Sequence, residues 1–178
     1  LYTLLITHRA TRPDGFKPMA VSNGTLLLGG IFLVMVLVQI VMGTQVREEI
    51  DHIAKSLGGE GRENWIGQLA GIYPVHKVFY YGMLVALIFW IRRLSPVSKQ
   101  QPLVKKLVLG TGIIFFMEVA AGVSMHIFVI TALLQSILLL GATLLFGLAF
   151  SLWMISLLGS RESKEELPEN RSELIPTS

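Results

Sequence analysis

The feature that most constrains this chain is the long apolar tract in its C-terminal half. The tract runs from Leu107 to Gly159 and holds 53 residues with few polar interruptions. One α-helix of that length would measure roughly 80 Å, whereas the hydrocarbon core of a bilayer is about 30 Å thick. The tract therefore predicts two membrane-spanning helices, over residues 107–127 and 132–158, with a tight turn near Met125–Ala132.

Two further apolar runs have the length of a membrane span, which is about 20 residues. They cover residues 24–46 and 73–91. The composition agrees, because 52% of the residues are hydrophobic and only 15% are charged, which is too apolar for an ordinary soluble domain. The predicted fold is an all-α integral membrane protein, a four-helix transmembrane bundle over residues 23–159.

The charged segments predict the orientation of this bundle. Residues 92–106 carry five basic and no acidic residues, and the expected linker over residues 1–22 is also basic. Residues 47–72 are expected to form a polar loop, in which three basic and five acidic residues give a net charge of −2. Basic loops remain on the cytoplasmic side, so both termini are expected to be cytoplasmic. Residues 160–178 are expected to form a polar C-terminal tail that is disordered or bound at the surface.

The residue types that the chain lacks narrow its chemistry. There is no cysteine, which excludes disulfides, thiolate metal sites, iron–sulfur clusters and covalent haem attachment through a CxxCH motif. The net charge of +3 is modest and gives no reason to expect nucleic acid as a partner. Ionisable residues at membrane depth are costly and mark functional sites, so histidines inside the spans become the main candidates.

His76 lies near the start of the second predicted span. Helical spacing places Tyr80 and Met83 on the same stripe of that helix. An imidazole with flat apolar neighbours suits an axial haem ligand, and Arg47 or Lys77 could supply a cation for the haem propionates. An interfacial histidine that anchors the helix among the lipid headgroups is equally compatible with this spacing.

Two more ionisable residues are candidates for contact with a cofactor. Glu118 lies about three turns into the third span and is interpreted as a neutral acid that holds the helices together. Its expected partners are Gln39, Gln45 or Gln135, and a role in a proton path is the alternative. His126, at the outer end of the same span, is a candidate second axial ligand, although a helix-end histidine in contact with water is the commoner situation.

Five segments of the chain resemble the haem A synthase family. They are QIVMGTQVREEID at 39–51, RENWI at 62–66, YPVHKVF at 73–79, EVAAG at 118–122 and LLQSILLLGATLLFG at 133–147. Together they cover about residues 25–158 in the order of the family pattern. The resemblance is closest to the cysteine-less bacterial branch of the family.

The resemblance implies a membrane oxidoreductase that oxidises the C8 methyl of haem O to the formyl of haem A for terminal oxidase assembly. The family has eight spans in two similar halves, and this chain, which starts at Leu1, would be the second half. It would lie in the bacterial cytoplasmic membrane, in contact with the lipid bilayer. Its implied partners are the N-terminal catalytic half of the same protein, haem O and haem A, with a homo-oligomer or haem O synthase as further partners. The fragment alone is expected to be inactive.

The residues at a few positions indicate which of the two halves of the family this chain resembles. His76 matches the haem-ligating histidine of the family, with Lys77 where arginine is usual. The partner histidine would follow three residues after Gln135, and Leu138 stands there instead. Tyr73 stands where the catalytic half carries a glutamate. The resemblance therefore implies the cofactor half, which binds a haem b that relays electrons and has no catalytic residue of its own.

Leu138 leaves three states of this half open. They are a five-coordinate haem on His76, which is the preferred expectation, replacement of the missing ligand by His126, or a half without haem. Two other functions also remain open for the chain. One is a haem-less structural or assembly module, and the other is a small membrane cytochrome b that relays electrons from quinol.

Overall fold

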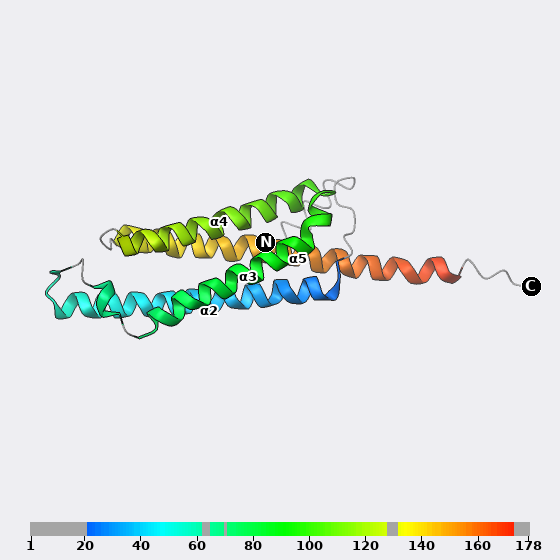
Figure 1. The fold of residues 1–178 in the computed structure, drawn as a ribbon. Helices are drawn as coiled ribbons and strands as arrows, with labels where there is room; N and C mark the ends of the chain where they lie inside the picture. The colour runs from blue at the N-terminus through cyan, green and yellow to red at the C-terminus, as the bar shows by residue number, and fades with distance from the viewer. Residues whose placement is uncertain (1–20, 62–64, 70, 128–131, 173–178) are drawn as a thin grey trace, which may run out of the picture.

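The computed structural model describes residues 21–61, 65–69, 71–127 and 132–172, and these ranges contain helices but no strand. The helices are α2 (Asn23–Ser56), the short 3₁₀ helix η2 (Ile66–Gln68), α3 (Tyr73–Ser98), α4 (Pro102–Ile127) and α5 (Ala132–Ser172) (Figure 1). The four α-helices are each long and apolar enough to cross a membrane. The prediction of an all-α chain with four helices of membrane-spanning length is therefore confirmed for the described residues.

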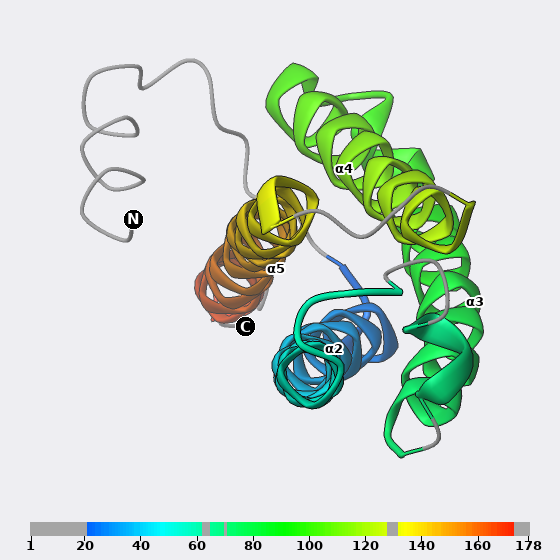
Figure 2. The same cartoon turned by 90° about the vertical axis from the view of Figure 1, so that its left-hand side faces the viewer.

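The four long helices form a bundle in which each helix packs against two others. α2 packs against α3 and α5, and α4 completes the ring by packing against α3 and α5 (Figure 2). The closest contact is between α4 and α5, and the loosest is between α3 and α4. The start of α2 and the distal part of α5 meet at one end, where Val21 N–H donates to Ser160 Oγ over 3.2 Å.

The bundle interior is filled by large aromatic and aliphatic side chains. Phe32, Trp90 and Phe115 come from three different helices and are fully buried, with 5.6 Å between the ring centroids of Phe32 and Trp90. Rings in this tilted arrangement add to the stabilisation that burial alone gives. The outer faces are apolar as well, with Val78 and Phe116 more than half exposed, as expected of side chains that meet lipid tails.

All four long helices extend beyond the apolar runs, which corrects the expected loops and tail. α2 extends to Ser56, so the first part of the expected 47–72 loop is helical, and it ends before Gly58, Gly59 and Gly61, all with positive φ. α3 extends through Pro96 to Ser98 and α4 begins at Pro102, which leaves residues 99–101 of the expected 92–106 loop outside a helix.

The expected C-terminal tail is also helical for most of its length. α5 continues to Ser172 and projects beyond the end of the bundle (Figure 1). Backbone hydrogen bonds hold a helix together whether its side chains face lipid or water, so the end of an apolar run need not be the end of a helix. Residues 1–20, 62–64, 70, 128–131 and 173–178 lie outside the described part of the chain, and with them most of the expected linker and the centre of the turn expected near Met125–Ala132.

A small second core covers the end of α2 that lies beyond the apolar run. Ile50, Trp65 and Leu69 are buried there, away from the main core. Trp65 Nε1 donates to the Glu60 carbonyl oxygen over 2.9 Å, and the backbone N–H of Gly71 donates to Glu49 Oε1 over 3.0 Å. These contacts fold the segment between α2 and α3 back onto α2, close to the start of α3 and therefore to His76.

Candidate functional site

His76 occupies the first turn of α3 and its ring is half-buried. Pro74 fits the first turn of this helix, where its missing N–H costs no hydrogen bond, and the backbone N–H of His76 donates to the carbonyl oxygen of Ile72 over 2.9 Å. The imidazole faces α2, with 3.0 Å between His76 Nε2 and Gln39 Nε2. The histidine at the start of this span therefore points toward a neighbouring helix of the bundle.

Gln39 is the partner of this histidine and is only 8% exposed. Its Nε2 group also donates to the His76 carbonyl oxygen over 3.4 Å. An amide N–H can donate to His76 Nε2 only when that nitrogen carries a lone pair, so the contact favours the neutral imidazole with its proton on Nδ1. Gln39 Oε1 is buried and has no hydrogen-bond partner among the described residues, which leaves one strong acceptor inside the bundle.

Gly43 follows Gln39 by one helical turn and lies beside the same imidazole. A Cβ atom at this position would come within 3.6 Å of His76 Nε2. The backbone of α2 therefore approaches the ring directly, and a larger side chain at position 43 would occupy the space next to the nitrogen. The contact between Gln39 and His76 was not predictable from the sequence, because it depends on how α2 is rotated relative to α3.

Tyr80 and Met83 follow His76 along α3 and turn into the bundle. Met83 is 1% exposed, and the ring centroid of Tyr80 lies 5.1 Å from that of Phe115 on α4. Tyr80 also lies within electrostatic reach of Glu118, one helical turn after Phe115. The predicted stripe of His76, Tyr80 and Met83 on α3 therefore contacts α4 through Tyr80, which lies against Phe115 and near the carboxyl group of Glu118.

Glu118 lies half-buried against the backbone of α5. A Cβ atom added at Gly141 would overlap the Glu118 carboxyl group, so the glycine is what allows the side chain to fit. The structure corrects one expected pairing, because Gln39 bonds to His76 rather than to Glu118. Gln45, the second expected partner, is exposed. We refer to Gln39, Gly43, His76, Tyr80 and Glu118 as the His76 cluster.

The fit between Glu118 and Gly141 gives the first testable prediction. The Gly141→Ala substitution should displace the Glu118 carboxyl group and destabilise the bundle by about 1 kcal/mol, the lower end of the cost of overpacking, because the glutamate side chain is flexible. The matched control is Gly147→Ala on the same helix, where a Cβ would meet nothing within 4 Å. Stability is measured by denaturation in mixed detergent micelles. The second substitution Glu118→Ala should restore most of the loss in Gly141→Ala, and additive losses would contradict the contact.

The remaining predicted site residues lie apart from the cluster. Arg47 and Lys77 are exposed. Leu138 lies half-buried on α5. His126 belongs to the last turn of α4, and its side chain lies outside the described part of the chain. The structure therefore brings His76, Tyr80, Met83 and Glu118 to one interior region, and it adds Gln39 and Gly43 to them.

The ligand-type side chains of the His76 cluster limit what it could bind. The described residues contain no group of three His, Cys, Asp or Glu that could hold a metal ion without a macrocycle. A haem needs only one protein ligand on its iron, together with apolar walls. A haem on His76 would take its axial nitrogen from Nε2, and Gln39 would first have to release that nitrogen.

Comparisons with known proteins add no further assignment. No family model, no curated protein and no solved structure matches this chain. The structure shows a helical bundle whose four long helices are each long and apolar enough to cross a membrane, with a polar cluster among them.

Proposed function

We propose that this chain is the haem-binding, cofactor half of a membrane oxidoreductase of the haem A synthase type, with His76 as the axial ligand. The observation that carries the proposal is the direction of the imidazole. A histidine that anchors a helix at the interface extends its polar tip toward water or headgroups. His76 instead directs Nε2 to a buried amide on α2. That arrangement supports a ligand role over an anchoring role.

Each residue of the cluster has a distinct task in this proposal. A haem b would supply a one-electron relay. His76 would hold the iron, and the interior position of Met83 would exclude water from the ring. Gln39, once released from Nε2, offers its unpartnered Oε1 as an acceptor inside the bundle.

The charge distribution supports an orientation in the bacterial cytoplasmic membrane. Residues 92–106 hold five basic and no acidic residues. They lie at the same end as the start of α2 and Ser160 of α5, because Arg93 packs against Gly24. The positive-inside rule then makes this end, and both termini, cytoplasmic and turns the His76 end outward.

The oxidation of haem O to haem A would take place in the N-terminal half of the full-length protein. This chain has Tyr73 where a catalytic half of the family carries a glutamate, so it would support catalysis through its cofactor and be inactive alone. The partners of this proposal are the catalytic half, haem O, haem A and the bilayer, with a second copy of the chain or haem O synthase as further partners.

A second function is favoured by two observations and is kept as the alternative. Gln39 already satisfies His76 Nε2 within the protein, and Leu138 occupies the expected position of the second ligand. Both fit a module without haem that holds a catalytic partner half in place. In that module the Gln39–His76 contact would be a structural link between α2 and α3, one that contributes roughly 1 kcal/mol.

The two functions predict opposite results for the Gln39→Leu substitution. If His76 Nε2 binds iron, Gln39 competes for that nitrogen, and removing a hydrogen bond of about 1 kcal/mol should tighten haem binding about fivefold. The measurement is a titration of the purified full chain in detergent micelles with hemin, followed by optical absorbance. If the contact is purely structural, the substitution destabilises the bundle and leaves haem affinity unchanged.

The matched control is Gln45→Leu, since Gln45 lies on the same helix and is exposed. This variant should bind hemin as the unmodified chain does. Weaker binding by Gln39→Leu than by Gln45→Leu would contradict ligation through the nitrogen that Gln39 occupies.

A further inference from the structure

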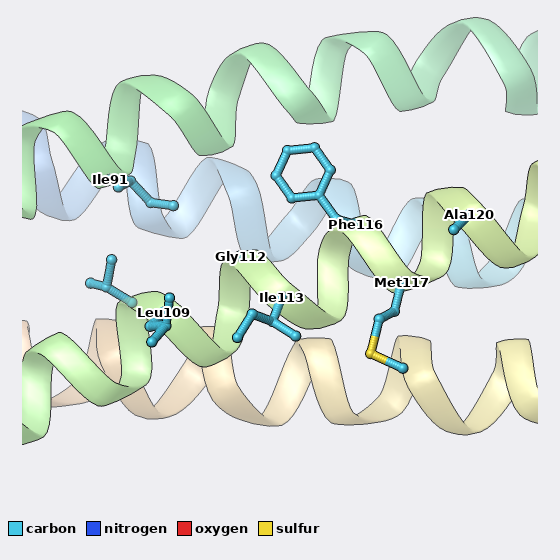
Figure 3. A pocket seen from close by; sticks show the side chains of 8 residues that line it. Ile91, Leu109, Gly112, Ile113, Phe116, Met117 and Ala120 are labelled. Carbon is cyan, nitrogen blue, oxygen red and sulfur yellow. The ribbon is translucent and has the colours of Figure 1, made fainter.

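An apolar groove runs along the outer face of the bundle between α3 and α4, which are the most loosely packed neighbours. It has a volume of about 580 Å³ and is lined by Ile91, Val108, Leu109, Gly112, Ile113, Phe116, Met117 and Ala120. Figure 3 shows these side chains following α4, with Ile91 on α3 at one end. The groove lies on the outer surface of the described bundle, where Leu109, Phe116 and Met117 are each at least 60% exposed.

The length of the groove indicates what can lie in it. Its lining on α4 runs from Val108 to Ala120, and twelve steps of 1.5 Å give about 18 Å. One leaflet of the hydrocarbon core is about 15 Å deep, half of the full thickness. A transmembrane helix from a second protein would need a groove of about 30 Å. The groove therefore matches a lipid acyl chain better than a helix.

Basic side chains gather at the end of the groove where α3 ends and α4 begins. Arg92 follows the lining residue Ile91, while Lys105 and Lys106 precede Val108 by one turn or less. All three are exposed. Lys105 lies four residues before Leu109 and Lys106 seven residues before Ile113, so helical spacing places both in line with the groove. Arg93 is different, because it packs against Gly24 on α2.

We propose that this groove is a specific site for an anionic phospholipid, with one acyl chain along α4 and the headgroup phosphate at Arg92, Lys105 and Lys106. Residues 92–106 contain no acidic side chain that would neutralise these cations. Basic pockets between transmembrane helices are a recurrent way to bind anionic headgroups. The site is independent of the His76 cluster and does not rest on haem binding.

Lipid selectivity of the full chain tests this proposal. The protein is reconstituted into vesicles of equimolar palmitoyl-oleoyl phosphatidylcholine and phosphatidylglycerol, extracted in mild detergent, and analysed by mass spectrometry for the lipids that remain bound. Two variants target the site, Lys105→Gln/Lys106→Gln for the headgroup and Gly112→Phe for the acyl chain. A Cβ at Gly112 meets nothing within 4 Å, so the new ring extends into the groove without displacing the core.

Each variant has a control on the same part of the chain. Lys99→Gln removes a cation between α3 and α4 that is not in line with the groove. Gly122→Phe places the same ring on α4 outside the groove lining, at a position where a Cβ also meets nothing within 4 Å. Far-UV circular dichroism verifies that all four variants keep their helices.

The expected result is enrichment of phosphatidylglycerol on the unmodified chain and on both controls. Each lysine near an anionic headgroup contributes about fivefold, so the double variant should lose on the order of 20-fold of the enrichment. Gly112→Phe should lose the bound lipid itself. Equal enrichment in every variant, or an equal loss with Lys99→Gln, would overturn the site in favour of diffuse attraction. A dimer that Gly112→Phe dissociates would overturn it in favour of a second copy.

Discussion

The His76→Ala substitution should abolish haem retention by this protein. The imidazole is the only ligand that the proposal gives the iron, so its removal should lower the haem content of the purified chain by roughly tenfold or more. The contact with Gln39 is lost at the same time, at a cost of about 1–3 kcal/mol for the buried amide left unpaired. Haem content is measured as the pyridine haemochrome per chain, on protein whose helix content is verified by circular dichroism.

His52→Ala is the matched control for this prediction. His52 lies on α2 beyond the apolar run and is exposed, so its removal should leave haem content unchanged. Equal haem content in the two variants would exclude His76 as the ligand. Loss of haem in both would point to binding that depends on surface histidines rather than on the bundle interior.

The Gly29→Ala substitution should produce the largest loss of stability among small changes in the core. A Cβ there would lie 2.7 Å from Trp153 Cδ1 and 2.8 Å from Trp90 Cε2. Trp90 is fully buried against Phe32, and Trp153 Nε1 donates to the Leu26 carbonyl oxygen over 2.9 Å. Neither indole can move freely, so the overpacked core should lose about 2 kcal/mol.

Gly30→Ala is the control for this effect, because the nearest atom to a Cβ at that position is Trp153 Nε1 at 3.8 Å. Replacing glycine in a helix by alanine is favourable by about 1 kcal/mol when nothing clashes. The two neighbouring substitutions should therefore change stability in opposite directions in a micellar denaturation experiment. A stable Gly29→Ala variant would show that the approach of α2 to the two tryptophans is not as close as described.

The four spans were predictable because hydropathy is a local property of the sequence. The apolar runs over 24–46 and 73–91 each predict one helix of membrane-spanning length, and the tract from Leu107 to Gly159 predicts two. The helix ends were not predictable from the same signal. α2 reaches Ser56 and α5 reaches Ser172 through polar sequence, where hydropathy says nothing about backbone conformation.

The candidate site was also predictable only in part: its residues on α3 were, and their contact with α2 was not. His76 was identified because placing an imidazole within a membrane span costs free energy. Helical spacing then identified Tyr80 and Met83 as its neighbours on the same face. The contact with Gln39 joins residues 37 positions apart and depends on the rotation of α2 about its axis. Sequence offered several amides as partners for Glu118 and none for His76, because polar residues in a span do not reveal which helix they face.

The optical spectrum of the purified full chain, oxidised and reduced, tests the central claim most directly. The protein is produced in haem-supplied cells and extracted in detergent, and haem is quantified as the pyridine haemochrome. The proposal predicts about one b-type haem per chain, with the high-spin character of a single axial ligand because Leu138 replaces the second histidine. A folded, haem-supplied preparation without haem would contradict the proposal and favour the structural module.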